Sequence, residues 1–122
     1  MTIAGKTILV VEDEPIIALA LEDLLFDGGA SPVFASTVEH GGTLIAEQSL
    51  DAAILDVNVH GQQSYPLARL LQEKNVPHIF ATGYGTTVHP AEFASVPTIA
   101  KPYTLADIER AMAAAAARSV SE

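Results

Sequence analysis

The sequence predicts a single α/β domain built on a parallel β-sheet with helices on both faces. Short apolar runs, typical of strands buried on both faces, alternate along the chain with stretches of helical periodicity. A composition that is 49% hydrophobic and 17% charged is that of a folded chain. The length of 122 residues suits one core of ordinary size. We therefore expect one domain over residues 1–122, without a separate output domain.

Charge and composition exclude several classes of function. The net charge is −9, whereas a nucleic-acid-binding surface needs clustered basic residues, so we expect no direct contact with nucleic acid. The chain has no cysteine, which excludes disulfides and thiolate metal ligands. No apolar run approaches the ~18 residues of a membrane span, and the N-terminal segment lacks the apolar core of a secretory signal. These features predict a cytoplasmic domain that does not insert into membranes.

The first half of the chain contains three predicted strands and two predicted helices. Two strands cover residues 6–11 and 31–36, and a third covers the apolar residues 52–55 and ends at Asp56. A helix follows Pro15, a residue suited to the first helical turn, and the glycines at positions 28 and 29 end it. A second helix is predicted over residues 38–47, although two glycines within it cost ~1 kcal/mol each. The apolar stripe of the first helix consists of Ile17, Ala20, Leu21, Leu24 and Leu25.

The second half continues this alternation. After a loop that contains Gly61, a helix runs to about Lys74, and a fourth strand covers residues 76–82. Residues 86–95 are cut by Pro90 and leave room for a short helix before a fifth strand at residues 96–100. Thr104 and Asp107 have the spacing of a Ser/Thr-x-x-acid helix start. The apolar positions of the last two long helices are Leu67, Leu70 and Leu71 in one and Leu105, Ile108, Met112 and Ala115 in the other.

Polar residues follow four of the five predicted strands. Strands that alternate with helices form a parallel sheet with right-handed crossovers, and such a sheet has its ligand site at the carboxyl ends of the strands. We therefore expect these polar residues to form one chemical site. They are Glu12 and Asp13 after the first strand, Asp56 at the end of the third, Thr82 at the end of the fourth and Lys101 at the end of the fifth.

The predicted site has the groups that phosphoryl chemistry needs. Clustered carboxylates repel each other unless a cation neutralises them, and oxygen ligands favour Mg²⁺. A carboxylate beside Mg²⁺ can act as a nucleophile toward phosphorus and form an aspartyl phosphate. The charge on the phosphoryl oxygens would be stabilised by the Lys101 ammonium, the Thr82 hydroxyl and loop N–H groups near residues 58–61 and Gly83.

These residues resemble the site of the receiver domains of two-component response regulators, and the resemblance covers essentially the whole chain. It implies a flavodoxin-like, doubly wound five-stranded sheet with strand order 2-1-3-4-5. It also implies that Asp56 accepts a phosphoryl group from a histidine kinase or a histidine phosphotransfer protein. A domain of this kind catalyses only its own phosphorylation and dephosphorylation. The matching residues are Glu12-Asp13, Asp56 in Ile54-Leu55-Asp56-Val57-Asn58, Thr82 in Ala81-Thr82-Gly83, and Lys101-Pro102.

The same resemblance implies further roles around Asp56. Asp13, Asp56 and the backbone carbonyl of Asn58 would bind Mg²⁺, with Glu12 acting mainly through water. The peptide bond between Lys101 and Pro102 would be cis. A narrower resemblance lies in Phe80-Ala81-Thr82-Gly83-Tyr84-Gly85, which is similar to the FATGUY receivers. These are known mainly from alphaproteobacteria, often stand alone, and often pair with HWE-type histidine kinases.

The sequence departs from the common receiver pattern in two places. Most receivers carry an aromatic switch residue three positions before the conserved lysine, where this chain has Thr98. We expect Tyr84, two residues after Thr82, to take over that role. An unchanged shift on phosphorylation and unchanged partner affinity in Tyr84→Ala would contradict this expectation. Pro90 predicts that the fourth helix, between the fourth and fifth strands, is short or mobile.

Several interpretations of the chain stay open at this point. A receiver without an output domain signals by contact with a downstream protein or by phosphotransfer, or it serves as a phosphate sink or shuttle. A degenerate receiver would act only as a docking module. The segment from Thr82 to Thr87 also suggests a flavodoxin-like cofactor-binding module, although the acids after the first strand would repel a phosphate without a metal. Taken singly, Lys101 fits a solvated loop residue, Tyr103 a packing residue and His60 a surface residue.

Overall fold

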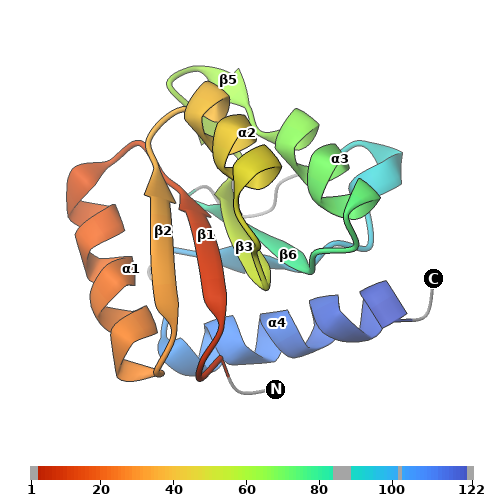
Figure 1. Cartoon of the computed structure of the whole chain (residues 1–122). Helices are drawn as coiled ribbons and strands as arrows, with labels where there is room; N and C mark the ends of the chain where they lie inside the picture. Colours follow the sequence, from red (N-terminus) through yellow and green to blue (C-terminus); the bar gives the residue numbers. More distant parts are fainter. Residues whose placement is uncertain (1–2, 84–88, 102, 121–122) are drawn as a thin grey trace.

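The computed structural model describes residues 3–83, 89–101 and 103–120 of the chain. They form a five-stranded parallel sheet in the order β2-β1-β3-β6-β7, covered by helices on both faces (Figure 1). The predicted fold class and strand order are confirmed, because β6 and β7 are the fourth and fifth strands of this sheet. The strands are β1 Thr7–Val11, β2 Ser31–Ala35, β3 Ala52–Asp56, β6 His78–Thr82 and β7 Thr98–Ala100, with a separate pair, β4 Asn58–Val59 and β5 Gln62–Gln63. The helices are α1 Pro15–Asp27, α2 Val38–Glu47, α3 Tyr65–Glu73 and α4 Leu105–Val120, and a 3-10 turn, η1, spans Ala91–Phe93.

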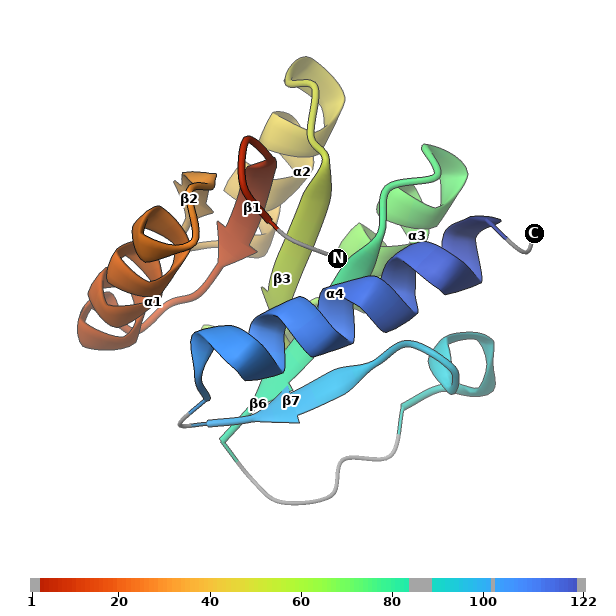
Figure 2. The same ribbon diagram turned by 90° about the horizontal axis from the view of Figure 1, so that it is seen from below.

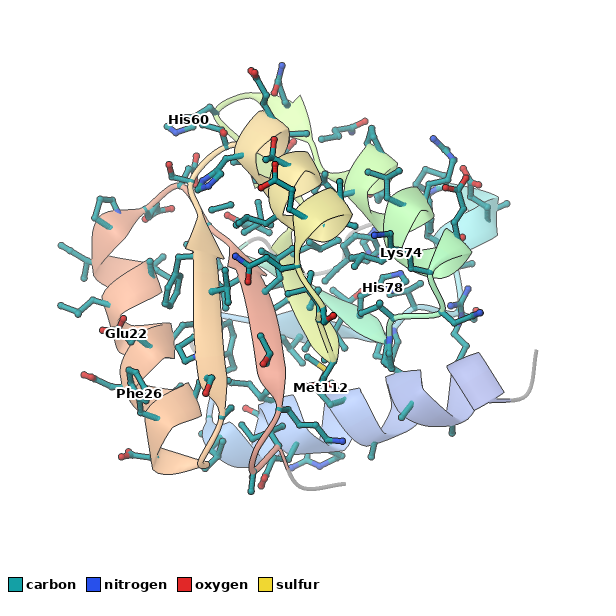
Figure 3. All side chains as sticks on the ribbon, viewed as in Figure 1. Glu22, Phe26, His60, Lys74, His78 and Met112 are labelled. Carbon is teal, nitrogen blue, oxygen red and sulfur yellow. The ribbon has the colours of Figure 1, made fainter. Side chains whose placement is uncertain are left out.

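The sheet separates two hydrophobic layers. In β1, Leu9 and Val11 pack with residues of α2 and α3, whereas Ile8 and Val10 pack with residues of α1 and α4, as the alternation of side chains along a strand requires. All four are buried, which explains why this strand is a continuous apolar run. Figure 2 shows α4 lying across β3, β6 and β7, and the labelled Met112 of α4 lies beneath the sheet in Figure 3.

Local sequence explains where the first and last helices begin and end. Pro15 stands in the first turn of α1, and Gly29, with a φ of 84°, leads the chain away in a conformation that glycine adopts readily. At the start of α4, the backbone N–H of Asp107 donates to the Thr104 hydroxyl at 3.1 Å, and the backbone N–H of Thr104 donates to the Asp107 carboxylate at 2.9 Å. This reciprocal cap confirms the predicted helix start. None of the described helices is long and apolar enough to cross a membrane.

Two segments differ from the sequence prediction. The stretch after Asp56, predicted as a loop, contains an antiparallel hairpin of β4 and β5. Its turn residues His60 and Gly61 have φ of 50° and 77°, the left-handed conformation that a two-residue hairpin turn requires. Leu70, expected on the apolar face of α3, is exposed.

The connection between β6 and β7 is where the sequence predicts a short or mobile helix. In the described part of this connection the only helical segment is η1, so the predicted helix is short there. Tyr84 lies outside the described residues.

Candidate functional site

The register of the parallel strands brings the predicted site residues to one edge of the sheet. Asp56, at the end of β3, pairs with Ala81, the residue before Thr82. Thr82 in turn pairs with Ala100, the residue before Lys101. The acidic pair follows β1, which borders β3 on its other side. The structure therefore brings together all five polar residues that the sequence analysis singled out at this edge.

A cavity of about 670 Å³ opens at this edge, beside α1. Its polar lining includes Asp13, Asp56, Thr82 and Lys101, and Tyr103 closes part of the wall. The side formed by α1 is mainly apolar and consists of Ile16, Ile17, Ala20, Leu21 and Leu24. An apolar wall with a few convergent polar groups is typical of a binding or reaction site.

Lys101 bridges two buried carboxylates in this site. Its Nζ lies 2.8 Å from Oε1 of Glu12 and 3.2 Å from Oδ1 of Asp56, and the Glu12 side chain is only 2% exposed. Burial, together with the neighbouring Asp56 carboxyl, raises the pKa of Glu12 to about 7, and the opposing effect of Lys101 does not offset this. Burial alone would lower the pKa of Lys101, but its hydrogen bonds to the two carboxylates and their charges outweigh burial and raise it. Lys101 therefore keeps its charge.

Asp13 is held by the hairpin that follows Asp56. The backbone N–H of His60, in the hairpin turn, donates a hydrogen bond of 2.9 Å to Oδ2 of Asp13. Burial tends to raise the pKa of Asp13, but this hydrogen bond and one from its own backbone N–H outweigh burial and lower it. The His60 side chain is exposed, as the surface interpretation predicted, and lies beside the hairpin at the top of Figure 3. His60 thus contributes to the site mainly through its backbone.

Three carboxylates form a cluster that suits a divalent cation. One oxygen atom each from Glu12, Asp13 and Asp56 lies within 4.8 Å of the other two. Carboxylate oxygens are hard ligands, so the donor set fits Mg²⁺ or a similar cation and not a thiophilic metal. Asn58 lines the same cavity from β4, although its predicted role as a ligand through the backbone carbonyl stays a prediction.

The remaining predicted residues fall in two groups. Thr82 is buried at the end of β6 and lines the cavity, and its backbone carbonyl accepts a hydrogen bond of 2.9 Å from the N–H of Lys101. Tyr84 and Pro102 lie outside the described residues, and with them the predicted switch residue and the predicted cis peptide bond.

Sequence reasoning missed the contacts of two residues, one that lines this cavity and one that does not. Tyr103 packs with the α4 layer as predicted, but it also lines the cavity, and its buried hydroxyl has no hydrogen-bond partner among the described residues. Burial and the charges of Glu12 and Asp56 raise the pKa of Tyr103, so the phenol keeps its proton. Its position two residues after Lys101 is the signal that points to the cavity. His89, by contrast, contacts Thr98 through a hydrogen bond that no sequence spacing indicates.

A parallel sheet of this order, with a polar site at the carboxyl ends of its strands, defines a doubly wound, flavodoxin-like α/β domain. No family model and no curated protein sequence matches the chain. Solved structures, however, match nearly all of it. The chain is 38% identical to SdrG from Sphingomonas melonis Fr1, over 94% of this chain and 98% of that one, with a TM-score of 0.82.

Two further solved structures are also similar to the chain. The BeF3-activated conformation of SdrG from Pseudomonas melonis Fr1 is 37% identical over 93% of this chain and 98% of that one, with a TM-score of 0.77. A response regulator receiver domain protein (CheY-like) from Methanospirillum hungatei JF-1 shares the fold at 20% identity, with a TM-score of 0.78 over 95% of this chain and 97% of that one. The chain belongs to the response regulator receiver family, as the resemblance of its site residues predicted.

Proposed function

We propose that the protein is a phosphoacceptor of two-component signalling that carries its phosphoryl group on Asp56. The observation that supports this most directly is the position of the Asp56 carboxylate. It lines the cavity, belongs to the acidic cluster and lies 3.2 Å from the Lys101 ammonium. A fixed positive charge at this place can neutralise the negative charge that a phosphoryl group brings.

The proposed reaction transfers a phosphoryl group from a phosphohistidine. A carboxylate oxygen of Asp56 forms a bond to phosphorus while the P–N bond breaks, and the leaving imidazole nitrogen takes the electron pair. Lys101 and the hydroxyl of Thr82 stabilise the transferred oxygens, because both line the cavity beside Asp56. Attack of water on phosphorus later breaks the P–O bond to Asp56, which restores the carboxylate and releases inorganic phosphate. In this proposal the domain acts only on its own aspartyl phosphate and is not an enzyme with a separate substrate.

The acidic cluster would hold Mg²⁺ during this reaction. Asp13 and Asp56 are the proposed carboxylate ligands, Glu12 acts mainly through water, and the backbone carbonyl of Asn58 completes the protein's contribution. Bound there, the cation would neutralise the carboxylates and the phosphoryl oxygens. The all-oxygen donor set within 4.8 Å supports this assignment.

The outer face of α1 supports a protein as the phosphodonor. Ile16, Leu19 and Phe26 are 83%, 61% and 59% exposed, and their spacing places them on one side of the helix. Figure 3 shows the labelled Phe26 on the side of α1 turned away from the sheet. Ile16 also lines the cavity, so a partner docked on α1 would have its reacting histidine close to Asp56. We propose a histidine kinase or histidine phosphotransfer protein as this partner, and the HWE type rests on the FATGUY resemblance alone.

The phosphorylated domain would then act on a downstream protein, pass the group on, or store it as a sink or shuttle in the cytoplasm. A flavodoxin-like cofactor module is less well supported, because the loop after β1 presents Glu12 and Asp13 where a cofactor phosphate would bind.

Phosphotransfer profiling against histidine kinases tests the proposal, with the nearly isosteric Asp56→Asn as control. We expect Mg²⁺-dependent labelling of the wild-type protein and none of Asp56→Asn. Labelling that persists in Asp56→Asn would overturn the assignment of the acceptor. If neither a kinase nor acetyl phosphate with Mg²⁺ labels the wild-type protein, the domain is a docking module. A coloured purified protein would instead indicate a bound cofactor.

A further inference from the structure

His89 joins three parts of the fold. Its Nδ1 lies 2.8 Å from the hydroxyl of Tyr65, the first residue of α3. Its Nε2 lies 2.7 Å from the hydroxyl of Thr98, the first residue of β7. His89 itself belongs to the connection that follows β6. Both ring nitrogens are thus engaged, each by a different element of the fold.

The imidazole is also part of a cluster of aromatic rings. Its centroid lies 4.5 Å from that of Phe80, and Tyr65 is in edge contact with both rings, at 5.7 Å from His89 and 5.4 Å from Phe80. Tyr65 also stacks on Phe93, with 5.5 Å between centroids. Phe80 and Phe93 are fully buried, and Phe80 stands two residues before Thr82. His89 is therefore fixed through its ring face as well as through its nitrogens, against the strand that carries Thr82.

The hydrogen bonds around His89 are consistent with one direction of donation. A neutral imidazole has one donor and one acceptor nitrogen. If Tyr65 donates to Nδ1, then Nε2–H donates to the Thr98 hydroxyl, which in turn donates to the backbone carbonyl of Val96 at 3.5 Å. The opposite direction leaves the Tyr65 proton without an acceptor in the described part of the chain. Burial lowers the pKa of His89, in keeping with a neutral ring.

We infer that His89 is a positioning residue whose hydrogen bonds to Tyr65 and Thr98 stabilise the unphosphorylated arrangement of the site. This inference rests on the proposed function. Thr82 stands two residues after Phe80 in β6, the His89 ring packs on Phe80 at 4.5 Å, and Phe80 pairs with Thr98 of β7. A displacement of Thr82 therefore moves the strand against a residue that α3 and β7 hold in place.

The described arrangement is the one that these hydrogen bonds stabilise. Asp56 Oδ1 contacts Lys101 directly at 3.2 Å, a contact that a free carboxylate makes and that a phosphoryl group on Asp56 would replace. Phosphoryl oxygens would also accept a hydrogen bond from Thr82, which draws that residue toward the site. The bonds at His89 oppose this movement, so their removal shifts the equilibrium toward the phosphorylated arrangement.

Titration with beryllium fluoride and Mg²⁺, followed through the amide resonances of Thr82 and Gly83, tests the inference. Thr98→Val and Tyr65→Phe each remove one hydroxyl with little change of shape. We expect each to lower the half-saturating concentration roughly 2- to 10-fold, the equivalent of one hydrogen bond. Thr43→Val is the matched control, since the exposed Thr43 hydroxyl donates to the carbonyl of Glu39 within its own helix. The control should titrate like the wild-type protein.

The imidazole nitrogen resonances separate this role from a general loosening of the fold. We expect a neutral Nε2–H ring in the free wild-type protein and a change in both nitrogen resonances at saturation. Unchanged nitrogen resonances, or half-saturation equal to wild type in both variants, would overturn the inference while the wild-type response upholds the proposed function. A wild-type protein that does not respond to beryllium fluoride would contradict the proposed function, and the inference with it.

Discussion

The Lys101 ammonium lies closer to Glu12, at 2.8 Å, than to Asp56, at 3.2 Å. Glu12, which is not the proposed phosphoacceptor, thus makes the shorter ion pair. Its second oxygen, Oε2, accepts a hydrogen bond of 3.1 Å from the backbone N–H of Asp13. Even with both oxygens engaged, burial and the Asp56 carboxyl raise the pKa of Glu12 to about 7. Glu12 therefore changes its charge close to neutral pH, which makes its ionisation measurable.

The metal-free protein should lose stability as the pH rises toward 7. The pKa of Glu12 is about 7 in the folded chain and 4.5 as an ordinary side chain, so the folded state binds more protons between these values. The contribution of Glu12 to the free energy of unfolding therefore falls through this window, by on the order of 1–2 kcal/mol after solvent screening. Above the window this contribution is constant. Urea denaturation with a chelator present measures the free energy of unfolding at each pH. Comparison with Glu12→Gln, whose side chain does not titrate, isolates the contribution of Glu12. A stability difference between the two proteins that does not vary with pH would contradict this prediction.

Mg²⁺ should stabilise the protein, and more strongly at pH 8 than at pH 6. A cation bound to the acidic cluster displaces the proton that Glu12 carries below its pKa, so its affinity rises with pH. Thermal melting at increasing Mg²⁺ concentrations measures this. Asp13→Asn should raise the Mg²⁺ concentration that is needed by roughly tenfold or more, because it removes a charged ligand. Asp23→Asn, the same change on the exposed side of α1, should leave the required Mg²⁺ concentration unaltered. Equal effects of the two substitutions would mean that only net charge matters.

Loss of the exposed apolar face of α1 should impair transfer from a protein donor only. We predict that Leu19→Ala slows phosphotransfer from the cognate kinase about 5- to 10-fold, the effect of removing an apolar anchor from an interface. The rate with acetyl phosphate should not change, because Leu19 does not line the cavity. Leu70→Ala, which truncates an exposed leucine on α3, is the control and should leave both rates unchanged. If Leu19→Ala slows both routes equally, α1 acts on the site and not on docking.

Most of the fold could be predicted from the sequence because its signals are local. Apolar runs such as residues 52–55 identify strands buried on both faces, and the Thr104–Asp107 pair identifies a helix start. The convergence of Asp56, Thr82 and Lys101 could also be predicted, since parallel strands end at the same edge of the sheet. Their roles in phosphoryl chemistry stay predictions.

Other features depend on contacts that sequence spacing does not reveal. The turn of the β4–β5 hairpin has His60 where asparagine or aspartate would be the usual signal, so the sequence does not indicate the backbone donor to Asp13. The absence of an aromatic residue at Thr98 was visible in the sequence. The hydrogen-bond partner of Thr98 is His89, which Tyr65 also holds from a distant element. Only the folded chain brings Tyr65, His89 and Thr98 together.

The two adjacent glycines of α2 should respond in opposite directions to substitution by alanine. In sequence they look alike, and each lowers helix propensity by ~1 kcal/mol relative to alanine. In the structure, a Cβ on Gly41 would lie 2.9 Å from Cδ1 of Leu67 and 3.2 Å from Cγ2 of Val11, whereas a Cβ on Gly42 would meet only Cδ2 of Leu67, at 3.7 Å. Leu67 and Val11 are both buried, so neither can move away without disturbing the core.

We therefore predict that Gly41→Ala lowers the free energy of unfolding by about 1–2 kcal/mol, because overpacking outweighs the gain in helix propensity. Gly42→Ala should raise it by up to about 1 kcal/mol, since it gains propensity and makes an ordinary van der Waals contact. Urea denaturation with unchanged m-values measures both, and each variant serves as the control for the other. If Gly41→Ala is as stable as Gly42→Ala, then α2 does not need a glycine in order to approach α3 and β1 this closely. The prediction at Gly42 depends on propensity alone and is unaffected by that result.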